Sequence, residues 1–422
     1  MRISVNRPWR VLCIGLLVVA VALVGCAAPA APSPTAAPAK PAAAATGAPA
    51  AAATSAPAAA KPAAYKIGHF VPLTGSQAEF GTSFAETAKM AVEEVNAKGG
   101  VDGVKLEMVT EDHMGDPKQG LTAFNKLVQV DKVPLIVGAW STVIMATAPV
   151  ADQNQVVLIN YGANAVTVRG SGKFVFSTFP LADLDIKVLA DYVYDKLSAR
   201  KGAVLYINND TGRSNAETFK AAFEAKGGKI LAYESHQPEA MDFGAQLAKI
   251  KAADPDVVHI PSLIQEMPRI VKQAREMGIK AQFTSYSVAE GQQLLDQGGD
   301  AADGLIYTFL APPETKPEVK EFYDRWKAKF GKVPPGSSYN MYVWDTLTTV
   351  VPAVIKYAAQ KGYGFTGEGL RKAFTEVKEF DTKVTGRTIF QFPGQDVKKP
   401  VTLKKVNAKE KKFDTLTVIE PQ

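Results

Sequence analysis

Residues 65–422 contain no cysteine, because the two cysteines of the chain, Cys13 and Cys26, lie within its first 26 positions. Disulfide scaffolds, cysteine-based zinc sites and thiol catalysis are therefore excluded for this part of the chain. The same residues also carry almost no net charge. Residues 1–64 hold five of the 48 basic residues and no acidic ones, which leaves 43 basic against 42 acidic residues. This balance excludes nucleic-acid binding through bulk positive charge.

Recognisable catalytic motifs are also lacking. No histidine occurs in an HExxH pattern, and no GxSxG sequence is present. The segment 169–174 resembles a phosphate loop but has Thr167 where glycine is needed and Phe174 where Ser or Thr is needed, so we interpret it as a surface turn. No metal site or cofactor is predicted, although Glu111, Asp112 and Asp116 could hold a cation if they do not simply cap a helix. The four histidines, of which the first and last fall in predicted strands and are expected to be packed, are His69, His113, His236 and His259.

The N-terminal segment has the features of a secretion signal. Three arginines precede an uncharged, mainly apolar run over 11–24, which is too short to span a membrane comfortably. The sequence of residues 23–26, Leu-Val-Gly-Cys, resembles the lipobox of bacterial lipoproteins. We therefore predict a signal peptide over 1–25, lipidation of Cys26, and a membrane-anchored protein that faces the outside or the periplasm. The alternative is an ordinary signal peptide or an uncleaved anchor.

Residues 27–64 form a low-complexity segment with 22 alanines and eight prolines among 38 positions. Alanine favours helix, but the recurrent prolines prevent one. We predict that 26–64 carries the lipidated cysteine and a disordered linker.

From residue 65 onward, β-rich and helical patterns alternate, which predicts an α/β fold with parallel sheets covered by helices. The apolar spacing of Phe84, Ala88, Ala91 and Val95 indicates one helix, and Asp116 followed by Pro117 is a strong start for the next. Further helices are predicted over 214–226, 265–277, 317–330 and 339–361. Strands are predicted over 65–71, 104–110, 133–137, 156–159, 203–207, 256–260 and 304–308.

The C-terminal segment is rich in lysine. We expect these lysines to lie on exposed strand edges, where they discourage aggregation, although contact with acidic lipid is an alternative. They are Lys398, Lys399, Lys404, Lys405, Lys409, Lys411 and Lys412.

The segments 72–75 (PLTG), 80–81 (FG), 96–103 (NAKGGVDG), 105–106 (KL), 116–119 (DPKQ) and 273–278 (QAREMG) together resemble the bacterial leucine/isoleucine/valine-binding proteins. These are solute-binding subunits of ABC importers. The resemblance implies a type I periplasmic binding protein, with two doubly wound parallel-sheet lobes, a three-strand hinge and the ligand in the cleft. It implies one lobe over 65–179 plus 311–388 and the other over 183–308 plus 389–422, with hinges near 178–180, 309–312 and 389–393.

The resemblance also implies a ligand site. In the first lobe, the loop after the third strand would bind a ligand carboxylate through Ser141 and Thr142 at a helix start, although both could be ordinary caps. The next loop would contribute backbone and side-chain groups, and an aromatic residue would pack on the ligand. Further first-lobe candidates are Phe80, Trp140, Gly162, Ala163 and Asn164, which stands where the family usually has Thr.

The second lobe departs from the family pattern. Thr211 and Leu263 stand where tyrosine and another aromatic residue are expected, and Ser287 stands where a glutamate pairs with the ligand ammonium. A buried ammonium without a carboxylate is costly. Asp210, Glu266 or Glu290 could substitute for that glutamate. The second-lobe candidates are Thr211, Ser262, Leu263, Tyr286 and Ser287.

The sequence therefore predicts a monomeric, non-enzymatic solute-binding protein that delivers a small organic ligand to an ABC permease and, through it, to ATPase subunits. Branched-chain amino acids are the family default, and an aromatic or other carboxylate or amide is the alternative. A ligand-binding protein that reports to a sensory receptor is a second class. A secreted enzyme is a third, disfavoured because no catalytic set is recognisable.

Overall fold

A computed structural model describes residues 62–420 of the chain. The predicted signal peptide, Cys26 and most of the linker lie outside the described residues. All of the described residues belong to one compact unit. In the described part of the chain, no helix is both long enough and apolar enough to cross a membrane.

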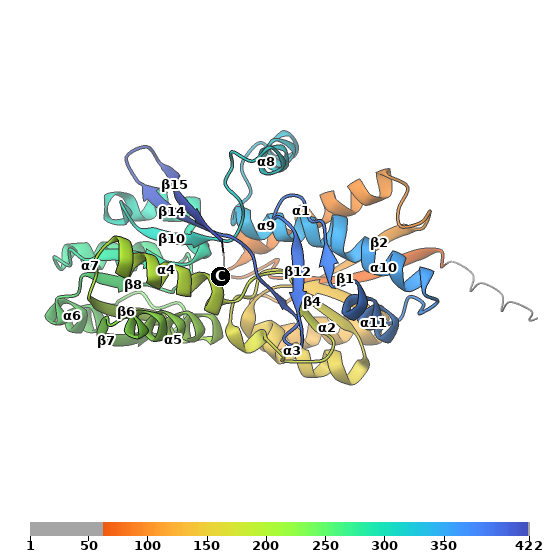
Figure 1. Ribbon diagram of the computed structural model, residues 1–422, viewed down its shortest axis with the longest axis horizontal. Coiled ribbons are helices and arrows are strands. Elements are labelled where there is room, and N and C mark those ends of the chain that lie inside the picture. Colours follow the sequence, from red (N-terminus) through yellow and green to blue (C-terminus); the bar gives the residue numbers. More distant parts are fainter. Residues whose placement is uncertain (1–61, 421–422) are drawn as a thin grey trace, which may run out of the picture. The chain divides into compact units, whose positions relative to one another are not determined.

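The first sheet has five strands in the order β2-β1-β3-β4-β5, and every neighbouring pair is parallel (Figure 1). Its middle strand β3 has no polar side chain, and β4 is apolar up to its last residue, Asn160, as expected when helices cover both faces. Its strands are β1 (Ala64–Val71), β2 (Lys105–Asp112), β3 (Leu135–Gly138), β4 (Val157–Asn160) and β5 (Val175–Ser177). Its crossover helices are α1 (Ala78–Ala97), α2 (Pro117–Gln129) and α3 (Ser141–Asn154), with a short 3-10 turn η1 (Val166–Val168) before β5.

Helix α2 begins where its sequence predicts. The side chain of Asp116 accepts hydrogen bonds from the backbone N–H groups of Lys118 and Gln119, both at 2.9 Å. Pro117 occupies the first helical position, where its missing N–H costs nothing. Phe124 and Leu127 are fully buried on the inner face of the helix. Asp116 is therefore a cap, as predicted, and the described residues contain no group of three or more potential metal ligands.

The second sheet has seven strands in the order β15-β14-β10-β9-β8-β6-β7. Its five strands from β6 to β10 are parallel, but β14 and β15 pair antiparallel at one edge. The sheet is thus mixed rather than purely parallel, because β14 and β15 form a hairpin with no crossover helix. The strands are β6 (Lys201–Ile207), β7 (Lys229–His236), β8 (Val257–His259), β9 (Gln282–Ser285), β10 (Ile306–Phe309), β14 (Val401–Asn407) and β15 (Lys412–Ile419).

Four α-helices and three shorter helical turns belong to the second sheet. The helices are α4 (Ala182–Lys196), α5 (Asp210–Ala225), α6 (Gly244–Ala253) and α7 (Met267–Glu276), and the turns are η2 (Ser287–Ala289), η3 (Leu294–Gly298) and η4 (Gly299–Ala302).

The chain then returns to the first sheet through a helical region. The predicted helix over 339–361 is interrupted by a π-helical segment, η5, just before Pro352, which has no N–H to continue the α-helical hydrogen bonds. Trp326 is buried and donates a hydrogen bond to Thr87 of α1, which attaches this region to the first sheet. The elements are α8 (Pro317–Phe330), α9 (Ser337–Asp345), η5 (Thr346–Val350), α10 (Val351–Gln360) and α11 (Gly367–Val377).

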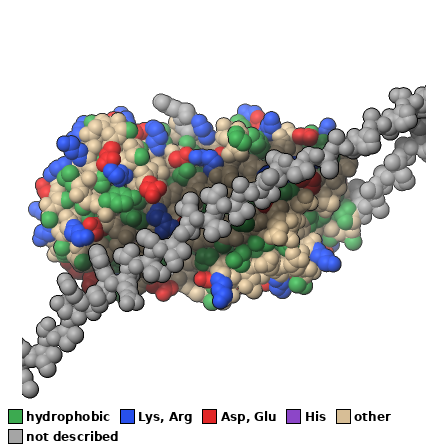
Figure 2. Space-filling view, turned by 90° about the horizontal axis from the view of Figure 1, so that it is seen from below, with side chains coloured by type: hydrophobic (Ala, Val, Ile, Leu, Met, Phe, Trp, Pro, Cys, Tyr) green, Lys and Arg blue, Asp and Glu red, His purple; other side chains and the backbone are tan. Residues whose placement is uncertain are grey.

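We call the first sheet with α1–α3 and α8–α11 the first lobe, and the second sheet with α4–α7 the second lobe. A small third sheet lies before the final crossing to the second lobe; its strands are β11 (Glu379–Phe380), β12 (Thr388–Gln391) and β13 (Asp396–Val397). Basic and acidic side chains are interspersed on the face shown in Figure 2, in keeping with the nearly neutral composition of residues 65–422.

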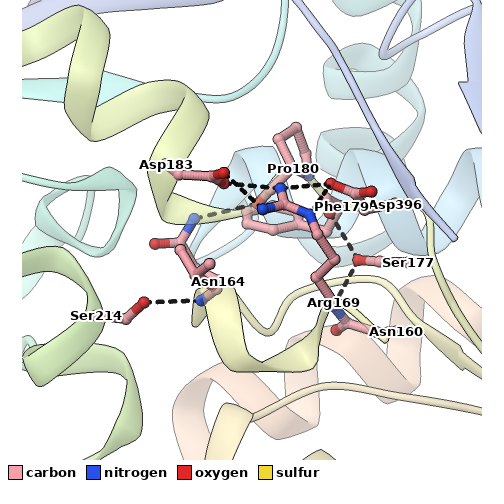
Figure 3. Close-up of polar contacts among 10 residues, drawn as sticks. Asn160, Asn164, Arg169, Ser177, Phe179, Pro180, Asp183, Ser214 and Asp396 are labelled. Atoms are coloured by element: carbon pink, nitrogen blue, oxygen red, sulfur yellow. Dashed lines mark hydrogen bonds and ion pairs between the residues drawn. The ribbon is translucent and has the colours of Figure 1, made fainter. Parts of the chain in front are cut away.

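Arg169 joins three segments near the crossings. Its guanidinium donates two hydrogen bonds to Asp183 at the start of α4, at 2.6 and 2.9 Å, and two to Asp396 of β13, at 3.0 and 2.6 Å (Figure 3). The turn that starts at Arg169 lies on the surface, as predicted. Paired contacts of this kind are geometrically specific. Arg169 therefore ties the first lobe to the segment that crosses from β5 to α4 and to the segment that crosses from β13 to β14.

Two of the C-terminal lysines are buried, which corrects the expectation that they lie on exposed strand edges. Lys399 and Lys404 are only 1% and 2% exposed. Lys399 donates a hydrogen bond to Thr388 Oγ1 at 2.6 Å, and burial lowers its pKa to about 7. Lys404 forms an ion pair with Glu290 at 2.8 Å. Glu290 lies 114 positions from Lys404, and the partners of Lys399 lie 11 to 17 positions before it and are uncharged, so a local charge pattern could not reveal them.

Candidate ligand-binding site between the lobes

The loops that follow the strands of the two lobes meet at a small cavity. The carboxyl ends of parallel strands lie at the same edge of a sheet, where ligands of open α/β sheets bind. In the first lobe these loops follow β3 and β4, and in the second lobe they follow β6, β8 and β9. The cavity is lined by Gln77, Phe80, Phe84, Ala139, Trp140, Ser141, Gly162, Asn164, Thr211, Leu263, Tyr286, Val288 and Tyr339.

None of these lining residues is Asp, Glu, Lys, Arg or His. Five of them are aromatic and form much of the wall. Phe84 contacts both Trp140 and Tyr339, with ring centroids 5.5 and 6.0 Å apart, and Phe80 packs edge-on against Phe84. The cavity therefore combines aromatic surface with uncharged hydrogen-bonding groups.

Ser141 is the first residue of helix α3, and its hydroxyl lies in the cavity wall. Its oxygen accepts hydrogen bonds from the backbone N–H of Ala165 at 3.2 Å and from the hydroxyl of Thr211 at 2.8 Å. The hydroxyl hydrogen of Ser141 therefore remains available to donate to a ligand. The helix N-terminus adds free backbone N–H groups and a favourable dipole for an anion.

Trp140 precedes this helix with a backbone φ of +70°, a conformation that is strained for a bulky side chain. Its indole packs between Phe84 and His113, each with a centroid distance of 5.5 Å. The surrounding aromatic rings thus hold the strained backbone in place and keep Trp140 in the cavity wall.

Several hydrogen bonds run directly between the lobes around the cavity. Gln77 donates to the side-chain oxygen of Gln265 at 2.9 Å, and Gln265 donates back to the carbonyl of Ser76 at 2.8 Å. Ser287 and the hydroxyl of Tyr339 share a hydrogen bond of 2.8 Å. The cavity measures about 60 Å³, room for only a few water molecules. The lobes are therefore closed on each other, and they must separate to admit an organic ligand.

Eight of the twelve residues predicted for the site line the cavity: Phe80, Trp140, Ser141, Gly162, Asn164, Thr211, Leu263 and Tyr286. Of the other four, Thr142 is half-buried beside Ser141 but is not part of the lining. The N–H and carbonyl of Ala163 bond to the side chain of Asn160. Ser262 shares a hydrogen bond with His236 at 3.0 Å, and Ser287 contacts Tyr339 rather than the cavity.

Five lining residues were not predicted from the sequence as part of the site: Gln77, Phe84, Ala139, Val288 and Tyr339. Phe84 stands one helical turn after Phe80, so its spacing could have indicated a shared face. Tyr339 comes from α9, far from the strand-end loops in sequence, and no local pattern marks it. Its ring is held by stacking on Phe179, with centroids 5.0 Å apart.

The polar atoms of Asn164 are already engaged within the protein. Its amide N–H donates to the carbonyl of Pro180 at 3.1 Å (Figure 3). Its oxygen accepts from Asn215 of α5 at 2.9 Å. Asn164 therefore connects the first lobe to the first crossing and to the second lobe. Its side chain contributes to the cavity wall without a free donor.

The three acidic residues considered as partners for a ligand ammonium are absent from the lining. Asp210 pairs with Arg213 at 2.7 Å, and Glu290 pairs with Lys404. Glu266 accepts a hydrogen bond from the backbone of Glu239, and burial raises its pKa. None of them supplies a carboxylate to the cavity in this closed arrangement.

The histidines are packed in the lobes rather than placed in the cavity lining. Burial lowers the pKa of His69 to about 3 and that of His113 to about 4, so both are neutral near pH 7. His69 forms a hydrogen bond of 2.8 Å with the hydroxyl of Tyr161 behind the cavity. These contacts confirm the prediction of packed histidines for His69 and His259, which are both fully buried.

Residues 64–411 match the family model described as periplasmic binding protein. The chain belongs to the periplasmic binding protein family. Relatives of this periplasmic binding protein include an amino acid binding protein of Pseudomonas aeruginosa, 31% identical over 68% of this chain and 77% of the relative. A Leu/Ile/Val-binding protein homolog of Brucella abortus is 33% identical over the same shares of the two chains. The resemblance found in the sequence is thereby confirmed.

Solved structures of other periplasmic binding proteins have the same fold. A leucine binding protein of Thermotoga maritima has a TM-score of 0.75 and 25% identity, covering 84% of this chain and 99% of that one. A solute binding protein of Rhodopseudomonas palustris in complex with 3,4-dihydroxybenzoic acid has a TM-score of 0.74 and 22% identity, covering 85% and 98%. The predicted two-lobed α/β class is confirmed, and the family implies an extracytoplasmic location.

Proposed function

We propose that this protein is the extracytoplasmic solute-binding subunit of an ABC importer and that it acts as a monomer. It captures a small organic molecule between its lobes and delivers the molecule to a permease that is driven by separate ATPase subunits. The protein binds its ligand without converting it. A ligand that contacts both lobes binds the closed state more tightly than the open one. The difference between the two binding free energies is the amount by which it stabilises the closed state.

The hinge and lobe limits belong to the same proposal. The first lobe comprises 65–179 plus 311–388, and the second comprises 183–308 plus 389–422. Within the last range, residues 389–397 hold strands of the small third sheet and lead to the crossing before β14. The chain passes between the sheets after β5, after β10 and before β14, which supports bending at these three places.

The ligand that fits best is a carboxylate with an uncharged apolar or aromatic body. The observation that carries this proposal is the placement of Ser141 and the N-terminus of α3 in a cavity whose lining has no Asp, Glu, Lys, Arg or His. A carboxylate can bind at the helix N-terminus, while the five aromatic residues enclose an apolar body. Branched-chain amino acids, named for the Brucella relative, remain the second candidate.

A ligand panel tests this proposal. We expect benzoate and 4-methylpentanoate, the deaminated analogue of leucine, to raise the thermal midpoint more than L-leucine does. The reason is that the leucine ammonium would lack a charged partner, and a hydrogen bond to a charged group is worth about 1.5–3 kcal/mol. Titration calorimetry should then give an affinity for leucine roughly tenfold to a hundredfold weaker. Tight leucine binding with much weaker acids would contradict the ligand class while leaving the transport role intact.

We also propose that Cys26 carries a lipid anchor and that residues 27–64 are a flexible spacer. A lipid-modified cysteine at this position would hold the described part of the protein near the membrane where the permease lies. The support is the order of the basic segment, the apolar run and the lipobox-like sequence.

Replacing Cys26 with alanine (Cys26→Ala) should release the protein from membranes or block its processing, because residues 27–422 offer no other cysteine. Cell fractionation and metabolic labelling with a fatty acid measure the two effects. Cys13→Ala is the matched control and should leave both unchanged, because Cys13 lies within the predicted signal peptide. A Cys26→Ala protein that remains labelled and membrane-bound would disprove the anchor.

A further inference from the structure

Asp185 of helix α4 is a fully buried carboxylate beside the ligand cavity. One of its oxygens accepts a hydrogen bond of 2.6 Å from the hydroxyl of Thr308, at the end of β10. The other is 3.4 Å from the amide nitrogen of Asn164, which belongs to the first lobe and lines the cavity. Asp185 thus lies where the second lobe, the second crossing and the first lobe meet.

No positively charged group compensates this carboxylate among residues 62–420. The titratable groups that face it are the phenols of Tyr286, Tyr339 and Tyr342, whose pKa values are all raised, so they stay neutral. Burial raises the pKa of Asp185 to about 7, and the hydrogen bonds from Thr308, from Asn164 and from the backbone N–H groups of residues 185 and 186 offset this only in part. Glu290, by contrast, is buried with Lys404 as its partner.

Part of this environment comes from the first lobe. Asn164 donates to Asp185, and Tyr339 and Tyr342 of α9 face it, so we expect lobe separation to withdraw these groups and to admit water. A solvated carboxylate is ionised near neutral pH, whereas an unpaired buried carboxylate favours its neutral form. A ligand carboxylate at Ser141 would add a second negative charge to the same closed region.

We propose that Asp185 couples ligand capture to proton uptake: it takes up a proton when the lobes close on an anionic ligand. The protonated side chain then no longer repels the ligand carboxylate, whereas the ionised side chain would. Asp185 is a positioning residue, because it acts through Asn164 and through its charge rather than by touching the ligand. The inference rests on the proposed carboxylate ligand. It gives the site a dependence on pH that its uncharged lining alone would not have.

The first measurement is made with saturating benzoate, so that the lobes are closed in the folded state. With a pKa near 7 in the folded state and about 4 in the unfolded state, Asp185 binds more protons when folded, so its contribution to stability is largest below pH 4 and is lost as pH rises to 7. The thermal midpoint of the wild type should therefore fall more between pH 5 and 8 than that of Asp185→Asn. The pKa of Glu266 is also raised, but Glu266 is present in both the wild type and the variant. The difference between their pH dependences therefore reports on Asp185.

The second measurement is calorimetry with benzoate and 4-methylpentanoate in two buffers that differ in ionisation enthalpy. Wild-type protein should take up about one proton per bound acid near pH 6, and its Kd should rise up to about tenfold per pH unit between pH 5.5 and 7 and level off above this range. Asp185→Asn should show neither effect. Asp191→Asn, at an exposed ion pair on the same helix, is the matched control and should resemble the wild type.

Thr308→Val provides a second variant that keeps the carboxyl group. It removes the shorter of the two hydrogen bonds that Asp185 accepts from side chains, and it should move the pH dependence to higher pH. Acid binding without proton uptake by the wild type would overturn the inference and leave the proposed function standing. Tight L-leucine binding with neither acid bound would instead overturn the ligand class and this inference with it.

Discussion

Replacing Ser141 with aspartate (Ser141→Asp) is expected to weaken the binding of benzoate or 4-methylpentanoate roughly 100- to 1,000-fold. Ser141 has a free hydroxyl hydrogen in the cavity wall, and a carboxylate there would face the ligand carboxylate. Two like charges about 4 Å apart repel by roughly 4 kcal/mol at the effective dielectric constant of about 20 that suits protein sites. Titration calorimetry measures the loss directly.

Folding of this variant should be largely preserved, because a negative charge is favourable at a helix N-terminus. Thr142→Asp is the matched control: it places the same charge one residue further along α3, at a position outside the cavity lining. Its loss of affinity should be much smaller. Equal losses in the two variants would mean that general electrostatics, rather than a ligand carboxylate at Ser141, sets the affinity.

Replacing Lys404 with methionine should destabilise the protein by about 3–5 kcal/mol, the usual cost of removing one partner from a buried ion pair. Lys404 is 2% exposed, and Glu290 would remain buried without its counter-charge. Because burial already raises the pKa of Glu290, the variant can protonate this carboxyl in acid. The loss, measured by chemical denaturation, should therefore be larger at pH 8 than at pH 5.

Two further variants separate charge from packing. Lys405→Met changes the neighbouring, half-buried lysine of β14, whose side chain points to the opposite face of the strand, and it should have little effect. The double variant Lys404→Met with Glu290→Met should recover most of the loss, since well-packed apolar residues often replace buried pairs without penalty. A double variant as unstable as Lys404→Met alone would show that shape, rather than the unpaired charge, causes the defect.

The sequence by itself determined the fold class and most of the regular elements. The cap at Asp116, the apolar strands and the helix over 317–330 are encoded by neighbouring residues, because capping, periodicity and β-propensity act over a few positions. The first-lobe loop was also predictable, since Ser141 begins a helix directly after a buried strand. The segments that resemble the family extended this local information to the two-lobed arrangement.

Only the tertiary structure decided which groups meet between the lobes. Tyr339 reaches the cavity from α9, and the amide of Asn164 is hydrogen-bonded to Pro180 and Asn215. Lys404 is buried against Glu290, which lies 114 positions away in sequence. Asp185 looks like any acidic residue in the first turn of a helix until the closed lobes bury it without a cation. Burial and ion pairing depend on segments that are remote in the chain, so local sequence patterns cannot predict which groups are buried or paired.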